Sequence, residues 1–334
     1  MRHGSGAGID SAEPKGVCRV AHVIDGDELA EVLRAEIEEE VSVLRLSAVR
    51  PGLATVIVGD DQTAHWYERH LRNLTESLDY RYACEQLYDD ATLDDVLATI
   101  GKLNADPRIS GILVLRPLPI HIPEHEVFGA VDPRKDVEGM HPWNLGLLAI
   151  GTPRFVPSTP AACFYLLDAY ARSRDEDPSS FYRGKTLVIV GRSTSVGKPL
   201  AFLGLQRDAT VVMCHSKTFQ AGELADYTRR ARILIAAAGE PGLIHGDMVQ
   251  DGVVAVDVGT NAVQDPDSGA MFLTGDLDLP SVSAKAEAIT PVPGGVGPIT
   301  DVWLIGNVLA AAAMSAQIEP RFGALITRRL LGHG

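Results

Sequence analysis

The sequence predicts an α/β fold, with an N-terminal α/β domain and a C-terminal Rossmann-type domain built on a parallel sheet. Short apolar runs without regular polar alternation recur along the chain, as in parallel strands that are buried on both faces. Segments of helix length separate these runs, as a doubly wound parallel sheet requires. At 334 residues the chain is long enough to bury the cores of two such domains.

The predicted N-terminal domain spans residues 20–155 and opens with an amphipathic helix. Apolar residues from Leu29 to Leu44 recur at three- and four-residue spacing, which is typical of a helix with one buried face. Strands and helices then alternate, with strands predicted at 53–59 and 109–115 and helices from residue 65 and at 92–106. The stretch "RPLPIHIPE" follows the second strand, and its prolines predict a loop.

The predicted Rossmann domain spans residues 156–300 and begins with a helix at 161–173. Its strands are predicted at 186–191, 209–215, 233–239 and 252–259. A last helix, at 301–319, is apolar on most faces, so we expect the C-terminal segment 301–334 to pack back on the N-terminal domain. Residues 1–19 are rich in glycine and serine and lack the apolar region of a secretory signal, which predicts a disordered tail.

The composition argues against several classes of protein. A net charge of −14 opposes nucleic acid and anionic membrane surfaces as partners. No stretch approaches the ~18 consecutive apolar residues of a transmembrane helix. The four cysteines show neither a CxxC pair nor ligand-like spacing, so the sequence predicts no disulfide framework and no metal site. We expect a protein of the reducing cytoplasm.

A turn rich in small residues follows the first strand of the Rossmann domain. In "VIVGRSTSVGKPL" these residues join an apolar strand to a helix, so backbone N–H groups and the helix N-terminus can approach a pyrophosphate. A turn that needs glycine only for steric reasons is the alternative. The predicted cofactor contacts in this turn are Gly191, Arg192, Ser193, Ser195, Val196 and Gly197.

The end of the next strand indicates which dinucleotide this turn binds. An NAD site would offer an acidic residue here to the ribose 2′-hydroxyl, but the chain has His215, Ser216 and Lys217. Together with Arg192, these residues supply hydrogen-bond donors and positive charge suited to a 2′-phosphate. We therefore expect NADP, with NAD less favoured. Solvated surface charges at Arg192 and Lys217 are the alternative.

Four segments carry a resemblance to a known family. They are "PGLATVIVGDD", "KDVEGMHPWNLGLL", "VIVGRSTSVGKPL" with "CHSKT", and "TPVPGGVGPITDVWLIGN". In their order and spacing the chain resembles the bifunctional methylenetetrahydrofolate dehydrogenase/cyclohydrolase family. The resemblance implies a cleft between the domains for tetrahydrofolate and NADP, and a homodimer. It also implies hydride transfer from 5,10-methylenetetrahydrofolate to NADP, followed by hydrolysis of the methenyl product to 10-formyltetrahydrofolate.

On the cofactor side the chain matches the family pattern. By resemblance, the turn and Ser216 contact the nucleotide and its 2′-phosphate, and the loop at 291–300 lines the folate and the nicotinamide. The expected contacts outside the turn are Pro293, Gly294 and Gly295 with the substrate, and His215, Ser216, Thr260 and Gly294 with the cofactor.

On the folate side the chain departs from the family. The family's tyrosine is kept as Tyr67, but the positions of its lysine, serine, glutamine and aspartate hold Leu71, Ala64, Leu115 and Glu138. A lysine can transfer protons to and from attacking water, whereas leucine cannot. We therefore predict that cyclohydrolase activity is lost or very weak. The predicted substrate contacts on this side are Tyr67, Leu71, Leu115 and Glu138.

His70 is the candidate replacement for the lysine. It lies three residues after Tyr67, so both face the same side of a helix, and its pKa range would suit a general base. A histidine on the helix surface is the alternative, as is a Tyr67 that only packs on a ligand. Three functions remain open at this point: a dehydrogenase without cyclohydrolase activity, a one-carbon enzyme with another substrate, and a non-catalytic protein that binds nucleotide or folate.

Overall fold

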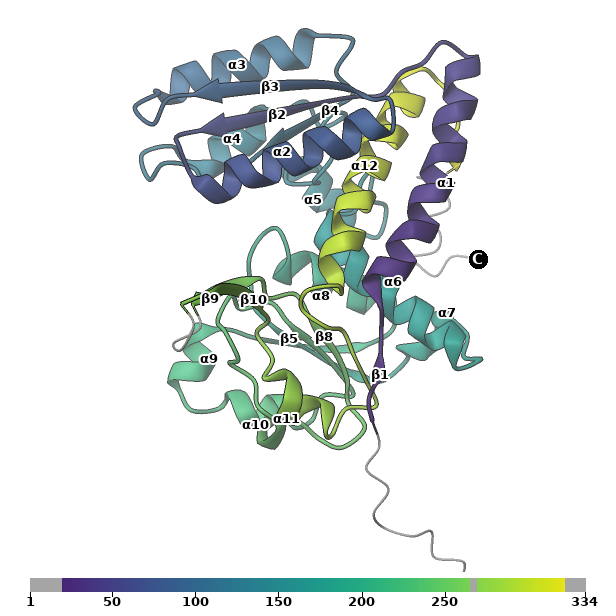
Figure 1. Cartoon of the computed structure of the whole chain (residues 1–334), viewed down its shortest axis with the longest axis vertical. Coiled ribbons are helices and arrows are strands. Elements are labelled where there is room, and N and C mark those ends of the chain that lie inside the picture. The colour runs from purple at the N-terminus through teal and green to yellow at the C-terminus, as the bar shows by residue number, and fades with distance from the viewer. Residues whose placement is uncertain (1–19, 265–268, 322–334) are drawn as a thin grey trace, which may run out of the picture.

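A computed structural model describes residues 20–264 and 269–321, which form two lobes (Figure 1). The predicted disordered tail at 1–19 lies outside the described residues, as does the C-terminal segment beyond residue 321. One lobe holds a three-stranded sheet and the other a six-stranded sheet. Two long helices, α1 (Gly26–Leu46) and α12 (Val296–Ser315), run side by side along the first lobe and reach toward the second.

The N-terminal lobe is built around strand β2 (Gly52–Val58), every residue of which is buried. β2 lies between β3 (Arg81–Leu87) and β4 (Gly111–Val114), and both pairings are parallel. β2 and β4 confirm the two predicted strands, whereas β3 was not predicted because it is an edge strand with exposed polar residues. The helices of this lobe are α2 (Gln62–Ser77), α3 (Leu93–Ala105), α4 (Glu124–Ala130) and α5 (Pro142–Ala149).

The C-terminal lobe holds a parallel sheet with the strand order β1-β11-β8-β7-β5-β6. Its strands are β1 (His22–Val23), β5 (Thr186–Val190), β6 (Thr210–Cys214), β7 (Ile233–Ala236), β8 (Val254–Asp257) and β11 (Ala288–Ile289). From β5 the chain passes to β6 at one edge and then to β7 on the other side of β5. The winding therefore reverses at β5, and ligands of such sheets bind at this point.

Helices of different lengths and a separate hairpin complete the C-terminal lobe. The helices are α6 (Ser158–Ser173), α7 (Pro178–Phe181), α8 (Gly197–Gln206), α9 (Ser216–Gln220), α10 (Leu224–Thr228), α11 (Leu279–Ser283) and the 3₁₀ helix η1 (Gly246–Met248). The hairpin pairs β9 (Asn261–Gln264) with β10 (Met271–Thr274) in antiparallel fashion. Together these elements place the carboxyl ends of β5 and β6 beside α8 and α9.

α12 begins at Val296, earlier than the predicted start at residue 301. It packs against α1 and α6, and its side chains from Val302 to Ala313 are buried. Among the described residues it is the one helix that is long and apolar enough to cross a membrane, but most of it is buried within the protein. α12 is therefore a core helix that joins the two lobes.

The lobes do not divide the chain into two consecutive pieces. β1 pairs in parallel with β11, with His22 opposite Ala288, so the first described strand belongs to the C-terminal sheet. Residues 22–23 thus belong to the C-terminal sheet and not to the N-terminal domain in which the sequence analysis placed them. The sequence did not predict this strand, because two residues are too few to give a pattern. The other predicted boundaries, at residues 155 and 300, stay predictions.

Candidate active site

The phosphate-binding turn joins β5 to α8 at the point where the sheet reverses its winding. Gly191 has a φ of +137°, and a Cβ at this position would lie 2.1 Å from the carbonyl oxygen of Ala237. At Gly197 a Cβ would lie 2.3 Å from the carbonyl oxygen of Gly191. Both positions therefore admit only glycine. The compact turn sets the N-terminus of the ten-residue helix α8 at the edge of the sheet.

Ser193 caps α8. Its hydroxyl oxygen accepts hydrogen bonds from the backbone N–H groups of Val196, at 3.1 Å, and Gly197, at 3.3 Å. Arg192 is exposed next to it, whereas Ser195 is buried. A phosphate bound at this helix N-terminus would share these two N–H groups with Ser193 or replace its hydroxyl.

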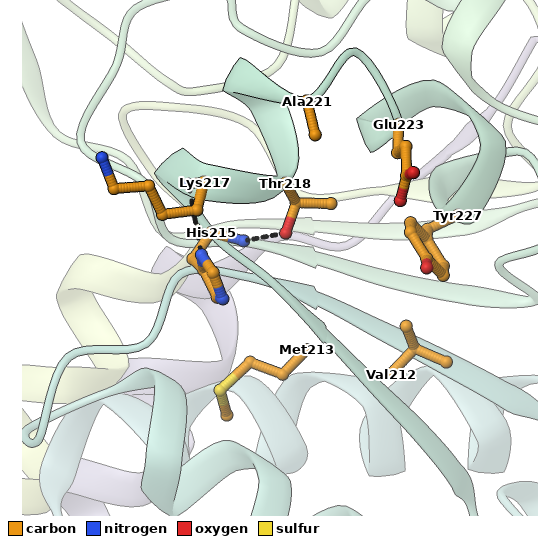
Figure 2. A pocket seen from close by; sticks show the side chains of 8 residues that line it. All are labelled: Val212, Met213, His215, Lys217, Thr218, Ala221, Glu223 and Tyr227. Carbon is orange, nitrogen blue, oxygen red and sulfur yellow. Dashed lines mark hydrogen bonds between the residues drawn. The ribbon is translucent and has the colours of Figure 1, made fainter.

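A hollow of about 390 Å³ lies beside β6 and the short helices α9 and α10 (Figure 2). Its lining residues are Val212, Met213, His215, Lys217, Thr218, Ala221, Glu223 and Tyr227. His215 is fixed by two hydrogen bonds: its Nδ1 accepts from the Lys217 N–H, and its own N–H donates to Thr218 Oγ1, both at 3.2 Å. His215 and Lys217 lie at one end of the hollow, and Glu223 and Tyr227 lie at the other.

A buried aspartate holds the loop that contacts the phosphate-binding turn. Asp276 has no exposed surface, and its carboxylate accepts hydrogen bonds from three consecutive N–H groups, those of Ala238 at 2.5 Å, Gly239 at 3.0 Å and Glu240 at 3.0 Å. The same loop contributes the Ala237 carbonyl that lies against Gly191. The Nδ2 of Asn261 also donates to Asp276, at 3.0 Å. Asp276 therefore ties this loop to the segment after β8.

Asp257, at the end of β8, supports Asp276 in turn. Its carboxylate accepts the backbone N–H groups of Gly259, Asp276 and Leu277, each at 2.9 Å. Burial raises the pKa of Asp257 to about 6, although these hydrogen bonds act in the opposite direction. Thr260, a predicted cofactor contact, is exposed directly after this network.

The substrate side of the site centres on Tyr67 and His70, which lie on α2. The Tyr67 hydroxyl donates to Oδ1 of Asp301 at 3.0 Å, and His70 Nε2 lies 2.9 Å from Oδ2 of the same carboxylate. Asp301 lies near the start of α12. One carboxylate from the far end of the chain therefore connects both predicted catalytic side chains.

These contacts change the protonation behaviour of both side chains. Burial raises the pKa of Tyr67 well above its ordinary value, and the charges of Asp301 and Glu138 raise it further. The hydrogen bond with Asp301 raises the pKa of His70, and burial opposes this shift. The His70 ring also stacks on the rings of Trp66 and Tyr67. Tyr67 is thus a neutral hydrogen-bond donor rather than a base.

Glu138 joins this group of side chains from the segment between α4 and α5. Burial raises the pKa of Glu138 to about 7, and the charges of Asp136 and Asp301 act in the same direction. The hydrogen bond from Ser158 and the charge of Arg116 lower it. Ser158 Oγ, at the start of α6, donates to Glu138 Oε1 at 2.6 Å. The pKa of Glu138 therefore lies well above that of an ordinary glutamate.

Leu71 and Leu115 belong to the hydrophobic core of the protein. Leu71 has no exposed surface, and Leu115 retains 5%. Leu71 therefore offers no accessible surface to a ligand in this structure, and its predicted contact with the substrate stays a prediction. Ala64 is buried as well, whereas Arg116 is exposed. The contact predicted for Leu115 stays a prediction.

The glycine loop before α12 lies against the N-terminus of α1. The N–H of Gly26 donates to the carbonyl oxygen of Gly294 at 2.8 Å, and a Cβ at Gly26 would lie 1.8 Å from the carbonyl oxygen of Gly295. Gly294 has a φ of +94°. Pro293 is exposed, Gly294 is half-buried and Gly295 is buried, so the first two offer more surface to a ligand than the third.

Sequence analysis did not find three of these groups: Asp301, Ser158 and the pair Asp257 and Asp276. For Asp301 a signal was present, since it is an acidic residue at the start of an otherwise apolar helix, directly after the glycine-rich stretch. Ser158 and the aspartate pair gave no such signal, because their partners are distant in the sequence. Among the described residues, no group of three or more His, Cys, Asp or Glu side chains is placed to hold a metal ion.

The fold and the site together define a class of protein. A parallel sheet carries a glycine-closed turn at its reversal point, which is the architecture of a dinucleotide-binding domain. A second α/β lobe contributes titratable side chains that meet α12. This is a two-domain α/β protein with a dinucleotide-binding domain and a separate catalytic domain.

Comparison with known proteins identifies the family within this class. The NAD(P)-binding domain of tetrahydrofolate dehydrogenase/cyclohydrolase matches residues 157–316, and the catalytic domain matches residues 24–138. The chain is 55% identical to bifunctional protein FolD 3 of Rubrobacter xylanophilus, over 90% of this chain and 95% of that protein. The chain belongs to the tetrahydrofolate dehydrogenase/cyclohydrolase family.

Solved structures agree with this assignment. The bifunctional FolD enzyme of Campylobacter jejuni has a TM-score of 0.80 and 37% identity, over 88% of this chain and 99% of that chain. The FolD enzyme of Trypanosoma brucei, in complex with NADP and an inhibitor, has a TM-score of 0.81 and 34% identity, over 89% of this chain and 99% of that chain.

Proposed function

We propose that this protein is an NADP-dependent 5,10-methylenetetrahydrofolate dehydrogenase whose cyclohydrolase reaction is lost or very weak. The observation that carries the proposal is a contrast between the two halves of the site. The cofactor half keeps a glycine-closed turn beside a hollow lined by His215 and Lys217. The folate half keeps Tyr67 but has the buried Leu71 where the family has its lysine.

The residues around the turn fit NADP. The N-terminus of α8 favours the negative charge of a pyrophosphate. At the end of β6, His215, Ser216 and Lys217 take the place of the acidic residue that would bind the ribose of NAD. When bound, NADP supplies the nicotinamide carbon that accepts a hydride. Asp276 keeps the loop at 238–240 in place next to this turn.

Hydride transfer asks for orientation and exclusion of water rather than proton transfer by the protein. Tyr67 is held by Asp301, and Glu138 is held by Ser158, so both side chains have fixed positions from which to orient a folate. Leu71 has no proton to exchange and no surface in the pocket. Lysine-dependent activation of water is therefore absent, which supports the proposed loss of hydrolysis.

A spectroscopic assay with 5,10-methylenetetrahydrofolate and NADP tests this proposal. It follows NADPH and the methenyl product separately. We expect equal amounts of both, with the methenyl product decaying no faster than in a control without protein. Rapid decay would contradict the loss of hydrolysis. Measurable NADP binding without NADPH formation would refute the dehydrogenase proposal and would favour another one-carbon substrate or a non-catalytic binding role.

The preference for NADP is tested by Arg192→Ala. We expect NADP affinity to fall about tenfold, as for the loss of one charged contact to a phosphate, while NAD affinity stays the same. Arg183→Ala is the matched control, since Arg183 is an exposed arginine of the same lobe. Equal effects on both dinucleotides would refute the assignment of Arg192 to the 2′-phosphate.

A homodimer in the cytoplasm is part of the same proposal. The support in the structure is the hairpin of β9 and β10, which forms a sheet of its own and exposes Met271, Phe272 and Leu273 on β10. Apolar side chains exposed together on a strand favour association with another copy. Light scattering coupled to size-exclusion chromatography should give twice the monomer mass, and Phe272→Glu should give the monomer. A wild-type monomer would refute the dimer.

A further inference from the structure

We propose that Asp301 is a specificity-determining residue, which makes the folate pocket prefer one-carbon folates that carry positive charge on the bridge between N5 and N10. The proposal rests on the proposed dehydrogenase function and names what its pocket selects. It concerns a residue that the family resemblance did not assign to the site.

Asp301 reaches the pocket as a carboxylate with uncharged or titratable partners. Its Oδ1 accepts the phenol of Tyr67 at 3.0 Å, and its Oδ2 lies 2.9 Å from His70 Nε2. About one fifth of the Asp301 side chain is exposed. Within the described ranges, no lysine or arginine forms an ion pair with it. His70 is therefore the one side chain among the described residues that forms an ion pair with Asp301.

Two carboxyl groups, those of Asp301 and Glu138, act on Tyr67 at this site. Asp301 and Glu138 lie close enough for the charge of Asp301 to raise the pKa of Glu138, and both raise the pKa of Tyr67. Arg116 is the cation that offsets Glu138. Leu71 stands where a lysine would have added a positive charge. A carboxylate without a lysine or arginine partner therefore stands beside Tyr67 and His70, the side chains proposed to meet the folate.

The proposed reaction creates positive charge on its substrate. The bridge carbon of 5,10-methylenetetrahydrofolate loses a hydride, with both electrons of its C–H bond, and the nicotinamide of NADP receives it. No proton is released, so the methenyl product keeps one positive charge shared by N5, the bridge carbon and N10. A fixed carboxylate near this bridge stabilises the charge as it develops and binds the cationic product more tightly than an uncharged folate.

Binding to two probes tests the proposal. They are 5,10-methenyltetrahydrofolate, which is cationic at the bridge, and tetrahydrofolate, which is not, each measured by stopped-flow fluorescence in the presence of NADP. For Asp301→Asn we expect Kd for the methenyl probe to rise about tenfold and Kd for tetrahydrofolate to change less than about twofold. Asp301→Glu retains the charge and should retain the preference.

Tyr67→Phe is the matched variant that separates charge from positioning. It removes the hydrogen bond to Oδ1 but leaves the carboxylate, so the preference for the cationic probe should persist even if turnover falls. Circular dichroism and NADP affinity check that each variant is folded. If Asp301→Asn weakens both probes equally, Asp301 only positions Tyr67, and the proposal is wrong.

Two other results would also be decisive. If Asp301→Asn leaves both affinities unchanged and only slows hydrolysis of the methenyl probe, Asp301 serves proton transfer, and the charge proposal is overturned. If wild-type protein forms no NADPH, the dehydrogenase proposal fails, but the comparison of the two probes still decides whether Asp301 selects a cation. The two proposals can therefore fail independently.

Discussion

Replacement of Asp276 by alanine should weaken both the fold and cofactor binding. The change removes the acceptor of three consecutive backbone N–H groups and of the Asn261 amide. A donor that loses its partner costs about 1–3 kcal/mol, and the low end applies here because water can reach the exposed loop at 238–240. We therefore expect Asp276→Ala to lower the free energy of unfolding by about 3 kcal/mol.

Urea unfolding followed by circular dichroism measures this loss, and fluorescence titration measures NADP binding. NADP affinity should fall with stability, because the released loop contains the Ala237 carbonyl that lies against Gly191. Asp226→Ala is the control, since Asp226 is an exposed carboxylate of the same lobe. A loss below about 1 kcal/mol with unchanged NADP affinity would refute the role of Asp276 as the organiser of this loop.

Three further predictions follow from buried groups. Burial raises the pKa of Glu138 from 4.5 to about 7, so the folded protein holds this proton more tightly than the unfolded chain. The resulting contribution to the free energy of unfolding, up to about 3 kcal/mol, is present below pH 4.5 and is lost as the pH rises through 7. Glu138→Gln should flatten this part of the stability profile in urea unfolding, and an unchanged slope would contradict it. Gly197→Ala should lower the free energy of unfolding by about 1–3 kcal/mol and weaken NADP binding. The control Gly101→Ala, in an open helical position, should be neutral or slightly stabilising. Equal changes of melting temperature in both variants would disprove this. Arg207→Leu leaves Asp168 buried without its ion pair and should cost about 3–5 kcal/mol, so a melting temperature within a degree of wild type would speak against it.

The sequence was sufficient for the strands that are buried on both faces. β2 and β5 read as largely apolar runs because each lies inside its sheet, and Thr55 is the one polar residue within β2. β3 was missed because an edge strand with exposed polar side chains has no such pattern. β1 and β11 have two residues each, which is too few for any periodicity. Strand prediction therefore followed burial.

For the site, local patterns sufficed on the cofactor side only. The turn from Gly191 to Gly197 is one continuous stretch, so its residue types alone predict its geometry. The contact between Tyr67 and Asp301 joins positions that are 234 residues apart, and no local pattern can reveal it. Leu71 shows the opposite difficulty: its place in the family motif suggested a ligand contact, but its burial is decided by how α2 packs. Tertiary packing supplied what the sequence could not.

The pairing of β1 with β11 has a consequence for the order in which the protein is made. The strand at His22 leaves the ribosome long before its partner at Ala288 is translated. The six-stranded sheet therefore cannot close during synthesis until Ala288 has emerged, and contacts of such long range form slowly. A fragment that begins after β1 leaves β11 as an open edge of the sheet, and such an edge can pair with another chain. Expression of the cofactor-binding half without β1 should thus give aggregation, because the C-terminal sheet needs a strand from the N-terminal end of the described chain.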